Sequence, residues 1–232
     1  MKLPKNDMWF ILAAFNEEKR ITKTIKDLKK EGYNNLVVID DGSEDNTYEL
    51  AKKEKVHVLK HPVNRGQGAA LRSGIEYALR KKAKYIIHFD ADGQHRVQDI
   101  PAMIKPVLEG KAEIALGSRY LDKNKKTKMP IHRTFYLKGG LWFTKLMTGL
   151  KLTDTHNGFR AMTAKAAREL KITQDEMEHA SEILELIARK KVKYKEVPVI
   201  ITYNEEVMEN STNSFKMGVQ IILKTIHYKF FK

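Results

Sequence analysis

The chain has 232 residues, of which 42% are hydrophobic, and its 43 Lys and Arg against 29 Asp and Glu give a formal net charge of +14. That length is enough to bury a sizeable core, and the composition excludes a disordered, collagen-like or low-complexity chain. The sequence contains no cysteine, which excludes a disulfide framework, a thiolate metal site and a cysteine nucleophile. No run approaches the roughly 20 apolar residues of a membrane-spanning helix, so we expect a cytoplasmic protein.

Short apolar runs alternate with longer amphipathic stretches through the first half of the chain. The runs are continuous in hydrophobicity, as in strands buried in a parallel sheet, and they predict strands at 9–14, 36–40, 56–59, 85–90 and 114–117. The stretches carry apolar residues at helical spacing and predict helices at 20–30, 46–55, 67–81 and 100–109. This alternation predicts an α/β fold with an open, mostly parallel, doubly wound sheet and helices on both faces. Ligands of such sheets bind beyond the carboxyl ends of the strands.

The second half of the chain is less regular. A basic loop at 122–128 is followed by helical patterns at 134–147, 164–170 and 181–190. Extended segments at 193–197 and 199–203 are separated by Pro198, which indicates a strand at the edge of the sheet. We predict one domain over 1–210, followed by a basic amphipathic helix within 211–232. For that helix we predict peripheral attachment to an anionic membrane, with packing on the protein's own core as the alternative.

Three of the predicted strands end in acidic turns. The first is followed by Phe15-Asn16-Glu17, the second by Asp41-Gly42-Ser43, and the fourth ends in Asp90-Ala91-Asp92-Gly93-Gln94. Each turn alone is also explained by turn formation or helix capping. Three such turns at one edge, however, are an electrostatic cost that a cation would offset. Mg²⁺ or Mn²⁺ would do so, because each takes oxygen ligands and shares them with substrate phosphates.

Two further segments carry candidate binding residues. Asn64 to Leu71 follows the third strand and opens a helix, but it lacks the third glycine of a dinucleotide fingerprint. Its glycines indicate a backbone that passes close to a ligand or to a neighbouring element. Arg119 follows directly at the end of the fifth strand. Its guanidinium would bind a diphosphate through two parallel hydrogen bonds, or alternatively Arg119 is an ordinary surface residue. Segments 154–160 and 177–182 add a second cluster of acidic and basic side chains.

Taken in this order, these motifs resemble those of the family 2 glycosyltransferases, above all the dolichyl- or polyprenyl-phosphate mannosyltransferase-like subgroup, which has the GT-A fold. The matching stretches lie between Phe10 and about Val199 and are 15–17, 40–45, 64–69, 90–95, 117–119, 154–160 and 196–199. Ala13 and Val97 stand where the family usually has proline. Residues 213–216 only loosely match the subgroup's Gly-x-Ser-Lys, which weakens the assignment of the acceptor site.

The resemblance implies a role for each matching residue. A nucleotide would be bound by Ala13, Phe15, Glu17, Asp41, Gly68, Asp90 and Arg119, the last of these on the diphosphate. A divalent metal, Mg²⁺ or Mn²⁺, would be surrounded by Asp90, Asp92 and Gln94. Arg133 would lie near an acceptor phosphate, and Glu182 near the acceptor as a candidate general base. Asp92, Glu182 and Arg133 are therefore the predicted catalytic residues.

The implied reaction is an inverting transfer of a hexose from a nucleoside-diphosphate sugar of the GDP-mannose or UDP-glucose/GlcNAc type. A polyprenyl phosphate acceptor has a second pKa of about 6 and is already an anion at neutral pH, so it needs cationic positioning rather than a base. The alternative acceptor, a sugar hydroxyl in cell-surface glycan or glycolipid assembly, does need a base, for which Glu182 is the candidate.

The positive charge also raises a third hypothesis, a non-catalytic nucleic-acid-binding protein. The sequence contains no recognised nucleic-acid-binding module, and the acidic strand ends would repel phosphates that carry no metal. We therefore expect no nucleic-acid partner. The partners we expect are a nucleotide-sugar donor, a polyprenyl phosphate or glycan acceptor, and an anionic membrane surface.

Overall fold

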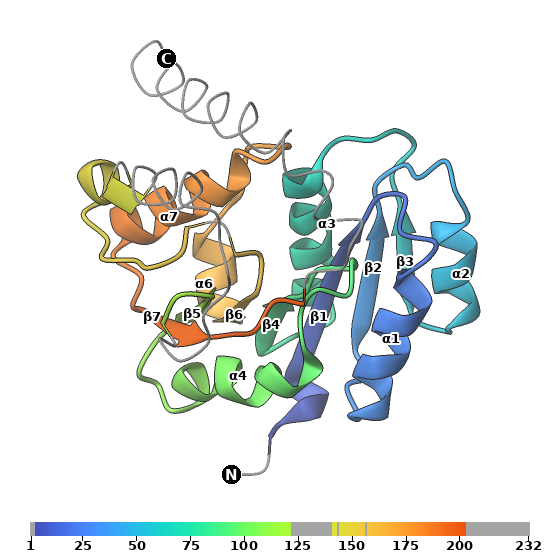
Figure 1. Cartoon of the computed structure of the whole chain (residues 1–232), viewed down its shortest axis with the longest axis horizontal. Coiled ribbons are helices and arrows are strands. Elements are labelled where there is room, and N and C mark those ends of the chain that lie inside the picture. Colours follow the sequence, from blue (N-terminus) through green and yellow to red (C-terminus); the bar gives the residue numbers. More distant parts are fainter. Residues whose placement is uncertain (1–2, 122–140, 143, 156, 203–232) are drawn as a thin grey trace.

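The computed structural model describes residues 3–121, 141–142, 144–155 and 157–202. Within these ranges one seven-stranded sheet has the order β3-β2-β1-β4-β6-β5-β7 (Figure 1). Its strands are β1 (Met8–Ala14), β2 (Leu36–Asp40), β3 (His57–Lys60), β4 (Tyr85–His88), β5 (Ile114–Ser118), β6 (Arg160–Thr163) and β7 (Tyr194–Pro198). All neighbours are parallel except β6, which runs antiparallel to β4 and β5.

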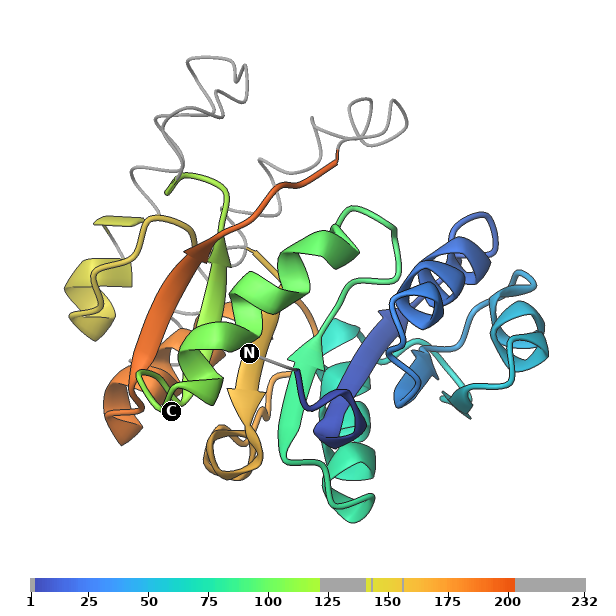
Figure 2. The same ribbon diagram turned by 90° about the horizontal axis from the view of Figure 1, so that it is seen from below.

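Helices cover both faces of the sheet. The described helices are α1 (Ile21–Lys30), α2 (Thr47–Lys53), α3 (Gln67–Arg80), α4 (Ile100–Leu108), α6 (Ala164–Glu169) and α7 (His179–Lys190), with short 3₁₀ turns at η1 (Lys5–Asp7) and η2 (Val97–Asp99). Buried residues of α1, α2 and α4 pack on one face, and those of α3, α6 and α7 pack on the other. Figure 2 shows the two groups on opposite sides of the strands. The predicted doubly wound α/β arrangement is therefore confirmed.

The central strand β1 shows why the core has two layers. Phe10 and Leu12 are fully buried against the α1 side, whereas Ile11, between them, is buried against the α3 side. Each such side chain stabilises the fold by roughly 1.5–3 kcal/mol relative to an exposed position. A Cβ on Gly74 of α3 would lie 2.3 Å from Cγ2 of Ile11, so the helix approaches the strand this closely only because residue 74 is glycine.

The sequence predicted most of these elements, with ends that differ by one or two residues. The strand β6 was not predicted, because it is only four residues long and its first residue, Arg160, is charged. The insertion of β6 makes the sheet mixed, although still mostly parallel. The predicted edge strand is confirmed as β7, which contains Pro198 at its end.

Several predicted features lie outside the described residues. These are the basic loop at 122–128, Arg133, most of the helix at 134–147, and the amphipathic helix within 211–232. The domain boundary at residue 210 therefore stays a prediction. None of the helices in the described ranges combines the length and the apolar character that crossing a membrane requires.

Candidate functional site

The three acidic turns lie at the same edge of the sheet. Strands β2, β1 and β4 are adjacent and parallel, so their carboxyl ends point the same way. The turn after β1 is tied to the turn after β2: the backbone N–H of Asn16 donates to Oγ of Ser43 over 2.9 Å, and that of Glu44 donates to Oδ1 of Asn16 over 3.0 Å. Asn16 adopts a φ of 55°, a left-handed conformation that asparagine tolerates. The interlocked turns fix the backbone from which Phe15 and Glu17 project.

The first turn places an aromatic ring and a carboxylate at this edge. Phe15 is 43% exposed, so its side chain is accessible to solvent. Glu17 is largely buried and forms an ion pair of 2.8 Å with Arg20. Burial raises the pKa of Glu17, the charge of Arg20 opposes that effect, and the charge of Asp92 adds to it. Glu17 and Asp92 therefore share one site, although the sequence places them on different turns.

The carboxylate of Asp41 is engaged by its own protein. It accepts hydrogen bonds from the backbone N–H groups of Gly66, at 2.7 Å, and Arg65, and lies 2.6 Å from Nδ1 of His61. These contacts anchor the 61–66 loop to the end of β2. Contact between Asp41 and a nucleotide stays a prediction, and its observed role is structural.

Gly68 is likewise explained by a neighbouring element. A Cβ at this position would lie 2.1 Å from the carbonyl oxygen of Gln174, and one at Gly66 would lie 2.5 Å from that of Asp175. The N–H of Ala69 donates to the same Asp175 carbonyl over 3.0 Å. Of the two reasons the sequence offered for these glycines, close approach of another segment is thus confirmed. The prediction that Gly68 contacts a nucleotide has no support from this packing.

The turn after β4 concentrates the negative charge. Burial opposes ionisation of Asp90, yet His95, 2.7 Å from its Oδ2, together with Arg160 and His88 lowers its pKa. Burial and the charge of Asp90 both raise the pKa of Asp92, whose Oδ1 accepts a 2.9 Å hydrogen bond from the N–H of Gln94. Ionised Asp90 therefore makes a second negative charge on Asp92 costly unless a cation is present.

These residues fit a divalent metal only in part. In the described ranges no group of three or more His, Cys, Asp or Glu side chains is arranged to hold a metal by itself. Asp90 and Asp92 supply two carboxylates, and the second oxygen of Asp92 accepts no hydrogen bond from a described residue. Mg²⁺ is commonly held by one or two carboxylates and completed by substrate phosphates. Two carboxylates suit a metal that arrives with a diphosphate, and the carboxamide of Gln94, two residues after Asp92, stays a predicted third ligand.

The guanidinium of Arg119 forms an ion pair with the carboxylate of Asp154. The Nε and Nη2 atoms lie 2.7 and 2.8 Å from the two carboxylate oxygens of Asp154, a bidentate pair, and the Asp154 side chain is fully buried. Glu196 of β7 in turn accepts hydrogen bonds from the N–H groups of Thr153, at 2.8 Å, and Asp154, at 3.1 Å. Contact of Arg119 with a diphosphate stays a prediction. In this structure its guanidinium binds Asp154, in the loop that precedes β6.

Comparison with known proteins shows the family to which the chain belongs. Residues 9–171 match the model for glycosyl transferase family 2. The chain belongs to this family. It is therefore a glycosyltransferase, and the resemblance inferred from its motifs is confirmed.

Two relatives and one solved structure illustrate the similarity. An uncharacterized protein of Methanocaldococcus jannaschii is 44% identical over 99% of this chain and 95% of its own length. A UDP-N-acetylglucosamine–dolichyl-phosphate N-acetylglucosaminyltransferase of Methanococcus voltae is 31% identical over 93% of this chain and 95% of its own. Glucosyl-3-phosphoglycerate synthase of Mycobacterium tuberculosis, solved with Mn²⁺, UDP and phosphoglyceric acid, superimposes with a TM-score of 0.70 at 15% identity over 94% of this chain and 77% of its own. That structural likeness confirms the GT-A fold.

Glu182, the predicted general base, lies in the first turn of α7. Its carboxylate accepts hydrogen bonds from the N–H groups of Thr173 and Gln174, each at 2.9 Å, and from the hydroxyl of Thr173. These hydrogen bonds hold the carboxylate against the 173–174 segment of the protein's own chain. The role of Glu182 as a base stays a prediction, and these contacts count against it.

Sequence reasoning assigned no role to three buried groups, two of which lie in the segments 154–160 and 177–182. They are Arg160, His88 and His179, all on the α3 and α7 side of the sheet and each at most 3% exposed. Burial, together with the charge of Arg160, lowers the pKa of His88 to about 3 and that of His179 to about 4, so both are neutral at physiological pH. The available signal was a charged residue inside the short apolar run Phe159-Arg160-Ala161-Met162.

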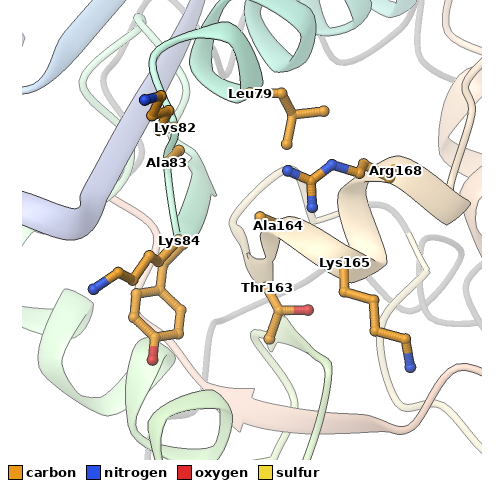
Figure 3. A pocket seen from close by; sticks show the side chains of 9 residues that line it. Leu79, Lys82, Ala83, Lys84, Thr163, Ala164, Lys165 and Arg168 are labelled. Atoms are coloured by element: carbon orange, nitrogen blue, oxygen red, sulfur yellow. The ribbon is translucent and has the colours of Figure 1, made fainter.

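A separate cavity of about 470 Å³ lies at the opposite edge of the sheet, beside the start of β4 and the end of β6 (Figure 3). Its lining includes four basic side chains, those of Lys82, Lys84, Lys165 and Arg168. Two of them are paired outside the cavity, Lys84 with Asp7 and Lys165 with Glu113. The cavity contains none of the predicted site residues, and we assign it no part in glycosyl transfer.

Proposed function

We propose that this glycosyltransferase moves a hexose from a nucleoside-diphosphate sugar to a polyprenyl phosphate, with Mg²⁺ or Mn²⁺ bound to the diphosphate. The observation that carries the proposal is the crowding of Glu17, Asp90 and Asp92 at one edge of the sheet, where the charge of Asp90 raises the pKa of Asp92 and the charge of Asp92 raises that of Glu17. The name of the Methanococcus voltae relative, which includes dolichyl phosphate, supports the acceptor. The name of the structural neighbour, which includes Mn²⁺ and UDP, supports the donor and the metal.

On this proposal, the chain's residues bind and orient the donor. Asp90, Asp92 and Gln94 hold the metal, and the exposed aromatic side chain of Phe15, with Ala13, binds the base. When bound, the metal stabilises the negative charge that grows on the departing diphosphate. Glu17 and Asp41 line the remaining part of the nucleotide site.

The transfer itself needs no general base when the acceptor is a phosphate. An acceptor phosphate oxygen attacks the anomeric carbon opposite the diphosphate; a new carbon–oxygen bond forms, and the old one breaks with its electron pair leaving on the nucleoside diphosphate. The engaged state of Glu182 agrees with this route. A sugar hydroxyl as acceptor would require a base, and the carboxylate of Glu182 would have to give up its hydrogen bonds to Thr173 and Gln174 to serve as one. Arg133 would position the acceptor phosphate as a cation.

The test is direct transfer to a short polyprenyl phosphate in detergent, using the full chain, Mn²⁺ and, in turn, UDP-glucose, UDP-N-acetylglucosamine and GDP-mannose. We expect one donor to yield a sugar-linked lipid and Asp92→Asn to lose it. Asp27→Asn is the matched control, because Asp27 lies on the outer side of α1 and Lys23 is its one ion-pair partner among the described residues. Transfer to a sugar hydroxyl, but not to the lipid phosphate, would contradict the proposal.

We also propose that the protein attaches to the cytoplasmic face of an anionic membrane. The net charge of +14 and a lipid acceptor support this location. The full chain should co-sediment with vesicles containing anionic lipid at low salt and be released at high salt. Failure to co-sediment at low salt would contradict it.

A further inference from the structure

The carboxylate of Asp90 lies against the backbone of Gly158, in the loop that precedes β6. A Cβ at position 158 would lie 2.6 Å from Oδ2, 2.8 Å from Oδ1 and 3.0 Å from Cγ of Asp90. The carboxylate therefore occupies the space that any side chain at this position would need. Gly158 is not among the residues with positive φ, so the position requires the absence of a side chain and not the backbone freedom of glycine.

His95 contacts the same carboxylate from a second direction. Its Nε2 lies 2.7 Å from Oδ2 of Asp90, and its side chain is 2% exposed. The imidazole ring packs against the rings of Phe89, with centroids 5.5 Å apart, and Phe159, with centroids 4.9 Å apart. Because both phenylalanines are fully or almost fully buried, the packing restricts rotation of the imidazole and fixes the atom that faces Asp90.

The acidic turn that carries Asp90 is itself held by two distant segments. The hydroxyl of Thr24, in α1, donates to the carbonyl oxygen of Ala91 over 3.1 Å. The N–H of Thr202, beyond the end of β7, donates to the carbonyl oxygen of Gln94 over 3.0 Å. The backbone of the turn is thus fixed by the protein alone, before any ligand binds.

The two oxygens of Asp90 have different surroundings as a result. Oδ2 faces His95, whereas the hydrogen-bond contact of Oδ1 among the described residues is with Nε2 of Gln67 at 3.5 Å, which is long for a hydrogen bond. The Asp90 side chain is 26% exposed, so the carboxylate is accessible from outside. Oδ1 is therefore the oxygen that the fold leaves available to a cation.

We propose that Gly158 and His95 are positioning residues, which together orient the Asp90 carboxylate so that Oδ1 meets the metal of the donor diphosphate. Gly158 leaves room for the carboxylate, and His95 holds its other oxygen. A ligand that is oriented in advance loses little conformational freedom when the metal binds, which favours binding. This inference rests on the proposed function, because it requires a divalent metal at Asp90.

The experiment is calorimetric binding of UDP and of GDP, each with Mn²⁺ and with a chelator, to the full chain and its variants. Gly158→Ala should displace the carboxylate and weaken Mn²⁺-dependent binding by roughly 10- to 100-fold, the usual effect of disturbing the support of a metal ligand. The matched control is Gly74→Ala, where a Cβ would lie 2.3 Å from Cγ2 of Ile11 in the packing of α3 on β1. It should lower the melting temperature but keep binding within about threefold of the wild type.

Two variants of His95 separate positioning from packing. His95→Phe keeps a ring against Phe89 and Phe159 but removes the N–H, so it should weaken Mn²⁺-dependent binding by roughly 10- to 100-fold. His95→Gln keeps a side-chain N–H and removes the ring, so it should lower the melting temperature and keep binding within about threefold of the wild type. A residue that only fills space would give the reverse order. If Gly158→Ala does not fold, this pair still tests the inference.

The possible outcomes separate the inference from the proposed function. A wild type without Mn²⁺-dependent binding of either nucleotide, or binding that Asp90→Ala leaves unchanged, would overturn the metal site at Asp90 and the positioning role with it. Binding that Asp90→Ala weakens, but that Gly158→Ala and His95→Phe leave unchanged, would overturn the positioning role alone. An equal loss of binding in Gly74→Ala and Gly158→Ala would overturn it too, since both would then reflect general damage to the fold.

Discussion

At the ends of β1 and β4 the ionised forms of Glu17 and Asp92 are opposed by burial and by the charge of a neighbouring carboxylate, whereas the carboxylates of Asp154, after β5, and Glu196, in β7, are held by bidentate or backbone donors. Ionisation of the first group destabilises the metal-free folded protein, whereas the hydrogen bonds and the ion pair of the second group stabilise it. A carboxylate that the fold leaves poorly compensated is available to a cation, and one that the fold satisfies serves the architecture. The difference distinguishes binding residues from structural ones that carry the same functional group.

Removing a carboxylate of the first group should have the largest effect on function. We expect Asp92→Ala to weaken binding of the nucleotide with Mn²⁺ by at least about a hundredfold, since a metal ligand is lost. The measurement is calorimetry with UDP and GDP in the presence and absence of Mn²⁺, with Asp27→Ala as the control. Unchanged metal-dependent binding would show that this turn is not the metal site.

Removing a carboxylate of the second group should instead reduce stability. Glu196→Ala leaves the N–H groups of Thr153 and Asp154 without their acceptor and should lower the free energy of unfolding by about 1–3 kcal/mol. Urea denaturation measures the loss. Lys195→Ala, an exposed neighbour on β7, should change stability little. Equal stability of the two variants would mean that this loop does not depend on Glu196.

The pH dependence of stability sharpens the comparison further. The pKa of Asp92 is raised above its ordinary value of 3.8, so its contribution to stability is present at low pH and is lost as the pH rises through the folded pKa. Metal-free wild type should therefore lose stability relative to Asp92→Asn as the pH is raised from about 4 towards 7. Melting temperatures of the two proteins in a chelator test this. A constant difference between them would contradict the crowding of the carboxylates.

Glu182 should give the smallest effect on transfer. Its hydrogen bonds resemble those of the second group, so Glu182→Gln should keep transfer to polyprenyl phosphate within about threefold of the wild type and lower the melting temperature. Glu185→Gln, on the same helix, controls for the loss of charge. A loss of roughly 100-fold or more would instead indicate a general base and favour a hydroxyl acceptor.

The sequence determined the family and most of the elements, because buried strands and amphipathic helices leave local patterns and the acidic turns follow the strands directly. It also placed Asp90, Asp92 and Glu17 at one edge, since the carboxyl ends of adjacent parallel strands meet there. Only the tertiary structure decided which polar groups are already occupied. Asp41, Gly68, Arg119 and Glu182 have the residue types of a binding site, but their contacts come from segments far away in the chain. The pairing of β6 between β4 and β5, which brings Arg160 between the two halves of the site, is likewise a long-range outcome that no local pattern records.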